Sequence, residues 1–281
     1  MKRFSKRFYV GLILLFLYLP IITLIVFSFN GSKTMARWSG FSLKWYGELF
    51  TDPIILDAIF VTLSIALLAS LISTVIGTMA AFGINSMKKH AKSLTLSGTY
   101  IPMINADIVT GVSMLLLFIL LRIPRGYITL LIAHITFCLP YVVLSVLPRL
   151  KSMDSALYEA ALDMGATPRQ AMLKVVLPDI MPGVITGFIL AFTLSFDDFV
   201  ISFFSTQGTL SNLSVYIYSM AKLGINPKIN ALSAIMFVVV VLLLIIINKR
   251  SPDVLAAQGG TSKSGEFKGQ KKSKSRSGAA A

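Results

Sequence analysis

Charged residues are scarce in this chain. Of its 281 residues, 14% are charged and 55% are hydrophobic, whereas a soluble domain normally carries about 25% charged residues. The single cysteine, Cys138, excludes a disulfide within the chain and a metal site built from cysteines. The sequence has no GxxxxGK(S/T) phosphate loop, so it lacks the usual means of hydrolysing ATP by itself.

Long apolar runs are what the sequence has instead. A membrane span needs roughly 20 mostly apolar residues, because the hydrocarbon core is about 30 Å thick and a helix rises about 1.5 Å per residue. Six segments meet this length and predict an all-α membrane protein with six transmembrane helices. They are 8–29, 58–86, 99–121, 127–149, 179–204 and 229–248. Pro20 in the first and Pro140 in the fourth predict local kinks.

The first apolar run follows four basic residues, as the core of a signal peptide would. The run is too long for such a core, and no small-x-small cleavage site clearly follows it. We therefore interpret 8–29 as a retained first span and 1–7 as a cytoplasmic N-terminus.

Basic residues are unevenly distributed around these spans. If the N-terminus is cytoplasmic, 19 of the 26 lysines and arginines fall at the N-terminus, in 87–98, in 149–178 and after 248. Basic residues concentrate on the cytoplasmic side of membrane proteins, so this asymmetry predicts that both termini lie in the cytoplasm. The net charge of +14 then reflects topology, and nucleic acid is not an expected partner.

Two segments outside the spans differ in character. The external segment 30–57 contains Trp38 and Trp45, and we interpret it as an interfacial aromatic belt or a packed loop. The tail 251–281 is rich in Gly, Ser, Lys and Ala and lacks apolar periodicity. That composition predicts a disordered basic tail, whose lysines can contact anionic membrane lipid. The transmembrane domain is therefore 8–250.

The segment 150–178, between the fourth and fifth spans, predicts a helix followed by a glycine turn. Asp154 or Ser155 can cap a short helix that runs to Met164. Gly165 follows where a left-handed residue usually ends a helix.

A second helix is predicted directly after this turn. Thr167 is its N-cap, Pro168 occupies its first position, and Gln170 completes a capping box. Pro178 either ends this helix or bends it into the next span. On local physics alone this is an amphipathic surface hairpin on the cytoplasmic face.

Three carboxylates stand out inside the apolar runs: Asp107 in the third span, and Asp197 and Asp198 near the end of the fifth. A charge at the bilayer centre costs about 2.5–3.5 kcal/mol on insertion scales, so each carboxylate requires an explanation. Adjacent helical residues point about 100° apart. One of the paired aspartates can therefore line a pore while the other packs on a partner, and the sequence leaves open which is which.

The acidic spans contain no lysine or arginine, which favours a cationic substrate. Carboxylates attract ammonium groups, and so do aromatic faces such as those of Phe196, Phe199 or Tyr216. The alternative is structural: the carboxylates cap broken helices or pair with basic groups. For His134, in the fourth span, a hydrogen bond to a neighbouring helix is favoured over a proton relay.

The segment after the fourth span resembles the EAA signature of binding-protein-dependent permeases. The matching residues are Glu159-Ala160-Ala161, Gly165 after three residues, Val175 after nine more, and Leu177-Pro178 after one more. Valine stands where the family usually has isoleucine. The family's signature forms a coupling helix that inserts into an ATPase subunit. The resemblance implies that Glu159, Ala160, Ala161 and Gly165 contact an ATPase, within a type I ABC importer permease (MetI-like) architecture.

Most of 8–250 also resembles the PotC-like permease subunits of spermidine/putrescine importers. The matching stretches are 134–140, 194–199 and 217–220. The resemblance implies half of a polyamine pathway in the bacterial inner membrane, with Asp107, Asp197 and Asp198 along it. It also implies a second homologous permease subunit (PotB-like), two ATPase subunits that bind ATP and Mg²⁺, and an extracytoplasmic polyamine-binding protein. No cofactor is expected on this chain.

Other functions compete with this one. An importer of the same class can carry another small solute, such as ferric iron or an amino-acid derivative, because relatives that import other solutes share the Asp-Asp pair. An ion-coupled transporter would work without an ATPase, but the chain shows no inverted repeat to support one. A membrane enzyme is least favoured, since no HExxH motif and no nucleophile elbow occur.

Overall fold

The computed structural model describes residues 2–32, 37–206, 210–224 and 227–250, so the predicted tail 251–281 lies outside it. Among these residues every regular element is a helix, which confirms the all-α class. The helices are α1 (Lys2–Ser28), α2 (Lys44–Leu49), α3 (Pro53–Ser86), α4 (Lys89–Ile104), α5 (Asp107–Leu120), α6 (Tyr127–Ser152), α7 (Ser155–Asp163), α8 (Pro168–Ala171), α9 (Leu177–Asp197), α10 (Val200–Ser205), α11 (Leu213–Leu223) and α12 (Pro227–Arg250). A π-helical turn, Met172–Val176, joins α8 to α9.

Five helical runs are long and apolar enough to cross a membrane. They are Arg7–Ser28, Pro53–Ser86, Tyr127–Ser152, Pro168–Asp197 and Pro227–Ile246. A sixth span requires α4 and α5 to be counted together as one bent pair. In chain order these six correspond to the six predicted segments, while the orientation of the termini stays a prediction.

The third predicted span, 99–121, is not one helix. α4 ends at Ile104, α5 begins at Asp107, and the two axes differ by 102°. Asn105 and Ala106 both adopt extended backbone angles, which interrupts the helical hydrogen-bond ladder. A window of mean hydropathy averages over such a break, so composition alone did not reveal this elbow.

The fifth predicted span, 179–204, also differs in its limits. Helical structure runs from Pro168 to Asp197 without a break, so Pro178 neither ends the second short helix nor separates it from the span. The N–H of Leu177 bonds to the carbonyl of Met172, and this wider π turn lies directly before Pro178. At the other end the helix stops at Asp197 and resumes as α10.

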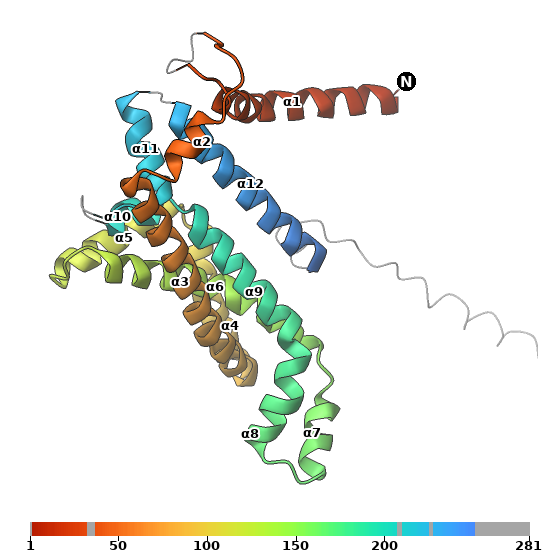
Figure 1. The fold of residues 1–281 in the computed structure, drawn as a ribbon. Coiled ribbons are helices and arrows are strands. Elements are labelled where there is room, and N and C mark those ends of the chain that lie inside the picture. Colours follow the sequence, from red (N-terminus) through yellow and green to blue (C-terminus); the bar gives the residue numbers. More distant parts are fainter. Residues whose placement is uncertain (1, 33–36, 207–209, 225–226, 251–281) are drawn as a thin grey trace, which may run out of the picture.

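The centre of the molecule is a bundle in which α3, α6 and α9 lie side by side (Figure 1). Small residues allow this close packing, as is usual between helices in membranes. A Cβ added to Gly77 on α3 would lie 2.7 Å from Cγ1 of Val142 on α6, and one on Gly187 of α9 would lie 3.3 Å from its Cα. Val142 is fully buried because α3 and α9 both pack against it.

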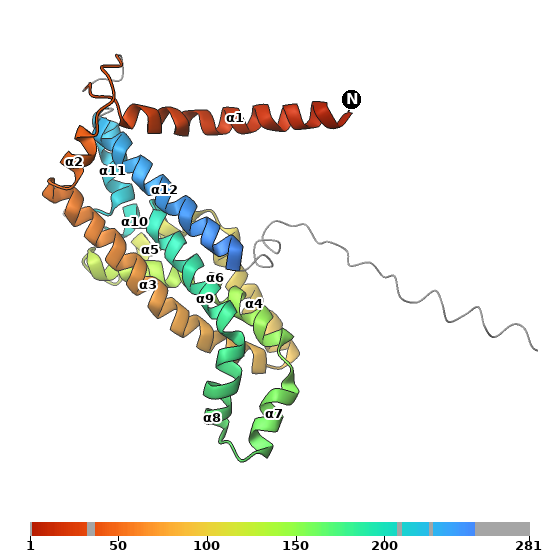
Figure 2. The same cartoon turned by 45° about the vertical axis from the view of Figure 1, so that its right-hand side comes forward.

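The two ends of the bundle carry different structures. α7 and α8 project from one end, and α2 and α11 lie at the other (Figure 1). α1 extends sideways from the α2 and α11 end (Figure 2). Its apolar side chains are largely exposed, including Phe16 and Leu17. Pro20 and Pro140 both lie inside helices that continue past them. The kinks predicted at these prolines stay predictions.

The α2 end is tied together by polar and apolar contacts. Trp45, which is 4% exposed, donates its indole N–H to the carbonyl of Asn30 at 2.6 Å. This contact supports the packed-loop interpretation of 30–57. Asp52 caps α3 by accepting from the N–H of Ile54 at 3.0 Å and also pairs with Lys228 on α12. The hydrogen bond from Lys228 is the main reason that the pKa of Asp52 lies below its usual value, although burial opposes the shift.

Candidate functional site

Asp198 connects α9 to α10. Its backbone is extended, and its carboxylate accepts hydrogen bonds from the N–H groups of Ile201 and Ser202 at 3.3 and 2.8 Å. The hydroxyl of Ser202 donates to it as well, at 2.9 Å. Free N–H groups at the start of a helix need such acceptors. Because the side chain is only 7% exposed, this carboxylate bonds to groups of its own chain and is not presented to a substrate.

His134 on α6 packs against the same place. One ring nitrogen lies 2.6 Å from the hydroxyl of Ser195 on α9, and the other lies 3.0 Å from that of Ser202 on α10. The second nitrogen also lies 3.6 Å from the carboxylate of Asp198. Both nitrogens therefore have partners on neighbouring helices, which confirms the hydrogen-bonding role predicted for this histidine.

Asn212 completes this group, which we call the Asp198 cluster (His134, Ser195, Asp198, Ser202 and Asn212). Its amide donates to the carbonyl of Asp198 at 3.1 Å and to the hydroxyl of Ser202 at 2.7 Å. Its oxygen accepts from the N–H of Val215 at 2.9 Å and so caps α11. The cluster fixes the ends of α9, α10 and α11 against α6.

The sequence reasoning missed Ser195, Ser202 and Asn212 as partners of Asp198. For Asn212 a signal existed, because an asparagine directly before an apolar helical run is a typical N-cap. For the serines no local signal existed: His134 and Ser195 are 61 residues apart in the chain.

Asp197 is the last residue of α9 and, unlike its neighbour, is exposed. The hydroxyl of Ser214 donates to its backbone carbonyl at 3.2 Å. The structure therefore separates the two aspartates that the sequence could not tell apart. Asp198 is committed to the cluster, and Asp197 presents its carboxylate at the surface of this subunit.

An aromatic group lies beside Asp197. The ring of Phe199 is 4.6 Å from that of Tyr218 on α11, and Phe203 lies 6.0 Å from Tyr218. The ammonium of Lys222 lies 4.6 Å from the centre of the Tyr218 ring. This face of Tyr218 therefore already accommodates an ammonium group, as cation–π attraction favours.

The other two aromatic candidates are placed differently. Phe196 is 5% exposed and stacks on Phe192 within α9 at 6.0 Å. Tyr216 is half-buried and packs with Trp45 and Leu49 in a separate apolar cluster. Of the three predicted aromatic partners, only Phe199 joins the group beside Asp197.

Asp107 is the first residue of α5 and is exposed just past the elbow. It does not join the Asp198 cluster. α5 nevertheless packs closely on α10, because a Cβ added to Gly111 would lie 2.8 Å from the ring of Phe204. The two exposed carboxylates, Asp107 and Asp197, are thus carried by elements that adjoin each other.

The predicted hairpin between α6 and α9 forms as expected in its first half. Asp154 caps α7 by accepting from the N–H of Ala156 at 3.0 Å. Gly165 has a φ of +86°, its N–H bonds to Leu162, and the next N–H bonds to Ala161. This pair of hydrogen bonds is the Schellman arrangement that ends helices at a left-handed glycine.

The second half also follows the prediction. Thr167 caps α8, with its hydroxyl accepting from the N–H of Gln170 at 3.4 Å. The side chain of Gln170 accepts from the N–H of Thr167 at 3.0 Å, which closes the capping box. Pro168 occupies the first helical position. The turn between α7 and α8 is thus held by local hydrogen bonds on both sides.

The hairpin exposes the residues of the signature. Glu159, Ala160 and Gly165 are exposed, and Ala161 is half-buried. Two large apolar side chains stand beside them, Leu157 at 47% and Met164 at 90% exposure. An exposed methionine next to small residues suits a protein contact, because the thioether side chain adapts to its partner.

Comparison with known sequences gives one family over nearly the whole chain. The profile described as "Binding-protein-dependent transport system inner membrane component" matches residues 1–256. The spermidine/putrescine transport system permease protein PotC of Escherichia coli strain K12 is 40% identical over 224 residues, covering 80% of this chain and 85% of that protein. PotC of Haemophilus influenzae is 36% identical over 236 residues, covering 84% and 92%. The putrescine transport system permease protein PotI of Escherichia coli strain K12 is 38% identical over 228 residues, covering 79% and 81%.

Solved structures share the fold at lower identity. A chain of a bacterial ABC transporter involved in alginate import superposes with a TM-score of 0.64 at 20% identity, covering 89% of this chain and 97% of that one. A chain of the inward-facing MetNI methionine ABC transporter gives 0.58 at 17% identity, covering 72% and 96%. These likenesses support the predicted importer-permease architecture.

Proposed function

The chain belongs to the family of binding-protein-dependent transport system inner membrane components, and from that premise we propose that it forms half of the pathway of an ATP-driven polyamine importer. It is a multi-pass protein of the bacterial inner membrane. Its curated relatives are named for spermidine/putrescine or putrescine transport. The substrates we propose are spermidine and putrescine, flexible chains with two or three ammonium groups.

The observation that carries this proposal is the exposure of Asp107 and Asp197, of which the first lies within the bent helix pair that can form one span and the second ends another candidate span. A carboxylate facing lipid is strongly unfavourable, so intramembrane acids face a water-filled cavity or a partner. Both lie on segments without lysine or arginine. A path lined by such groups attracts cations and repels anions. Ferric iron or an amino-acid derivative lacks the spaced ammonium groups that two separate carboxylates suit.

Aromatic side chains supply the second element of recognition. Phe199 and Tyr218 lie beside Asp197, and the ammonium of Lys222 already rests on one of these rings. The ammonium of a polyamine has the same chemistry as that of lysine. A carboxylate next to aromatic faces therefore binds such a cation by charge and by cation–π attraction. Asp198 serves this path indirectly, by holding the backbone that carries Asp197.

Coupling to ATP is proposed to run through the α7–α8 hairpin. Glu159, Ala160, Ala161 and Gly165 would contact an ATPase subunit, with Met164 as a further apolar contact. The helical run 168–197 connects this hairpin to Asp197 without a break. Closure of the ATPase subunits can therefore bias the substrate path between two arrangements.

The remaining partners follow from the same proposal. A second, PotB-like permease subunit supplies the other half of the path. Two ATPase subunits bind ATP and Mg²⁺, and an extracytoplasmic binding protein delivers the polyamine. The solved alginate transporter, described with its periplasmic protein, offers an example of such an assembly.

The complete transporter in proteoliposomes, with its binding protein and internal ATP, tests the proposal. We expect uptake of labelled spermidine or putrescine that requires both ATP and the binding protein. Binding assays on the isolated binding protein check the substrate, and failure to bind either polyamine rejects polyamine transport. Uptake that persists without the ATPase subunits would instead favour an ion-coupled transporter.

A further inference from the structure

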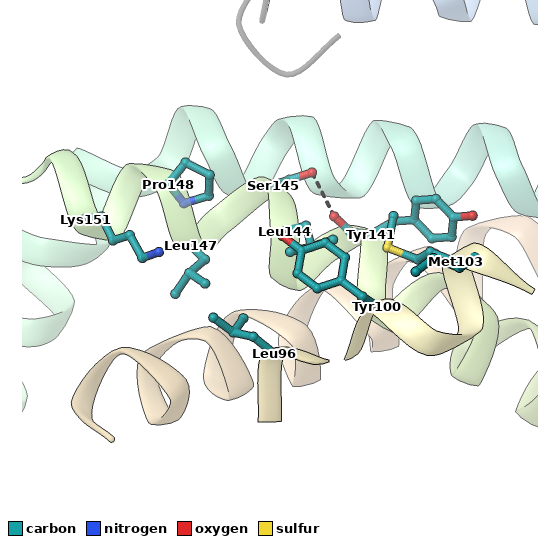
Figure 3. A pocket seen from close by; sticks show the side chains of 10 residues that line it. Leu96, Tyr100, Met103, Tyr141, Leu144, Ser145, Leu147, Pro148 and Lys151 are labelled. Atoms are coloured by element: carbon teal, nitrogen blue, oxygen red, sulfur yellow. Dashed lines mark hydrogen bonds between the residues drawn. The ribbon is translucent and has the colours of Figure 1, made fainter. Parts of the chain in front are cut away.

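A cavity of about 490 Å³ lies between α4 and α6 (Figure 3). Tyr100 and Met103 line it from α4, and Tyr141, Leu144 and Lys151 are among the residues that line it from α6. This volume falls in the range of about 300–1,000 Å³ that is usual for sites of small ligands. Its walls are mainly apolar.

A second cavity, of about 260 Å³, lies across the elbow from the first. Asn105, Thr110 and Phe137 are among its lining residues. On α6, Phe137 and Tyr141 are four residues apart and so share one helix face. The rings of these two residues touch edge to face, with centroids 5.6 Å apart. The two cavities therefore follow one side of α6, separated by the elbow.

Asp107 indicates what this side of the molecule faces. It follows the elbow directly, between Asn105 and Val109, which both line the second cavity. Its side chain is exposed, and an exposed carboxylate at membrane depth does not face lipid. The two cavities therefore adjoin a watery path rather than the bilayer.

The first cavity combines apolar walls with two phenols. Among the residues that the structure describes, no hydrogen bond is recorded for the hydroxyl of Tyr100 or Tyr141. Ser145, by contrast, already donates to the backbone carbonyl of Tyr141 at 2.9 Å (Figure 3). The phenol hydroxyls thus have acceptor capacity for a ligand, and the ring faces attract ammonium groups.

The two ends of the cavity differ in charge. Lys151 lies at one end, and Met103 and Tyr141 lie at the opposite end (Figure 3). Met103 precedes Asp107 by four residues in the chain. The ammonium of Lys151 repels other cations. A polycation in the cavity is therefore held at the tyrosine end, with its methylene groups against leucines such as Leu144.

We infer that the α4–α6 cavity binds a linear alkyl polyammonium ion in transit, with Tyr100 and Tyr141 as specificity-determining residues. This inference rests on the proposed function, polyamine import. It adds a site on the side of the elbow away from Phe137 and independent of the aromatic group beside Asp197. An anion gains nothing from two phenol rings, and an ion without methylene groups gains nothing from the apolar walls.

Leucine substitutions in the reconstituted transporter test this site. Tyr100→Leu and Tyr141→Leu should each lower spermidine uptake at least about fivefold, because a cation–π contact of about 1 kcal/mol is lost. Tyr141→Phe keeps the ring and should restore most of the uptake. Tyr9→Leu, an exposed tyrosine on α1, is the matched control and should behave as wild type.

The outcomes separate the two levels of the proposal. If wild type imports spermidine and both leucine variants do so at the wild-type rate, the inference is wrong and the proposed function stands. If wild type imports no polyamine, the proposed function itself fails.

A labelling experiment checks the site without relying on transport. The only native cysteine, Cys138, is fully buried, so wild type reports the background. Leu144→Cys should react with a water-soluble, positively charged thiosulfonate, and spermidine should slow this reaction several-fold. Reaction only with a lipid-soluble maleimide, or a rate that spermidine leaves unchanged, overturns the inference.

Discussion

Asp197 and Asp198 are neighbours in the chain with opposite surroundings. Asp197 is exposed beside Phe199 and Tyr218, whereas the carboxylate of Asp198 is 7% exposed and accepts three hydrogen bonds. Removing the charge of Asp197 changes the electrostatic attraction that a cationic substrate experiences. Removing that of Asp198 leaves buried donors without an acceptor, which costs about 1–3 kcal/mol per group.

The two aspartates should therefore fail in different assays. Asp197→Asn should reduce ATP-dependent polyamine uptake about tenfold or more while leaving thermal stability near wild type, because the lost charge matters only to a passing cation. Asp198→Ala should lower the free energy of unfolding by at least about 1–3 kcal/mol, because the three donors at the start of α10 lose their acceptor. Uptake assays and thermal denaturation in detergent measure the two effects. Equal stability losses in both variants would contradict this assignment.

For single residues, the sequence identified which side chains are important better than it identified the residues that they contact. The three intramembrane aspartates were identified from their position in apolar runs, because charge there is costly whatever the fold. The capping role of Asp198 was one of two alternatives. Choosing between these alternatives requires the three-dimensional positions of His134 and Asn212. Hydrophobic periodicity does not reveal that α6 and α11, which are far apart in the sequence, meet at Asp198.

Among the elements, α3 and α12 are joined at one end by Asp52 and Lys228. The hydrogen bond from Lys228 lowers the pKa of Asp52 from its usual value of 3.8. A carboxyl group with a lowered pKa contributes stability that is present above its unfolded pKa and is lost as the pH falls through its folded pKa. The contribution of this pair should therefore begin to fall near pH 3.8 and be lost progressively as the pH drops further.

Asp52→Asn should remove this part of the acid sensitivity. The melting temperature of the purified chain, followed from pH 6 to pH 3, should fall less steeply than that of wild type. Lys228→Met removes the other partner and should flatten the curve in the same way. A wild-type slope in both variants would show that the ion pair does not govern acid stability.

The turn between α7 and α8 depends on Gly165, whose φ of +86° suits glycine. Gly165→Val forces a β-branched residue into a left-handed conformation, at a cost of about 1–2 kcal/mol, and should distort the coupling hairpin. We expect uptake to fall strongly while spans and assembly persist. Gly165→Asn, which tolerates this conformation better, should retain more uptake. If the valine variant transports at the wild-type rate, the hairpin is not the coupling element.

The same elements show why some local structure was predictable. The α7–α8 hairpin formed as expected because its capping groups lie within five residues of the groups they satisfy. The elbow at Asn105 and Ala106 was missed because mean hydropathy stays high across it. The end of α9 was missed for the same reason, since Phe199 and Val200 continue the apolar run beyond the break.

For the whole molecule, packing around Val142 sets how closely α3, α6 and α9 approach. A Cβ on Gly77 would lie 2.7 Å from this valine, too close for two carbon atoms. Gly77→Ala should therefore destabilise the bundle by about 1–3 kcal/mol, as overpacking does. The double variant Gly77→Ala with Val142→Ala should recover part of that loss, because the smaller side chain makes room.

Gly83→Ala is the matched control on the same helix, since a Cβ there meets nothing within 4 Å. It should not lower the melting temperature of the detergent-solubilised chain, because alanine favours the helix and meets no neighbour there. Alanine favours a helix more than glycine does, so helix propensity would not lower the stability of either variant. An equal loss in both glycine variants would show that contact with Val142 does not set the effect.

The unbroken helical run from Pro168 to Asp197 has a consequence for how the chain can vary. Its 30 residues span about 45 Å at 1.5 Å per residue. A residue inserted or deleted within it would also turn one end by about 100° relative to the other. The helical run thus fixes both the distance between the hairpin and Asp197 and the rotation of one about the helix axis relative to the other. Length changes are compatible with both ends only in whole turns, or where a π turn such as Met172–Val176 absorbs the extra residue.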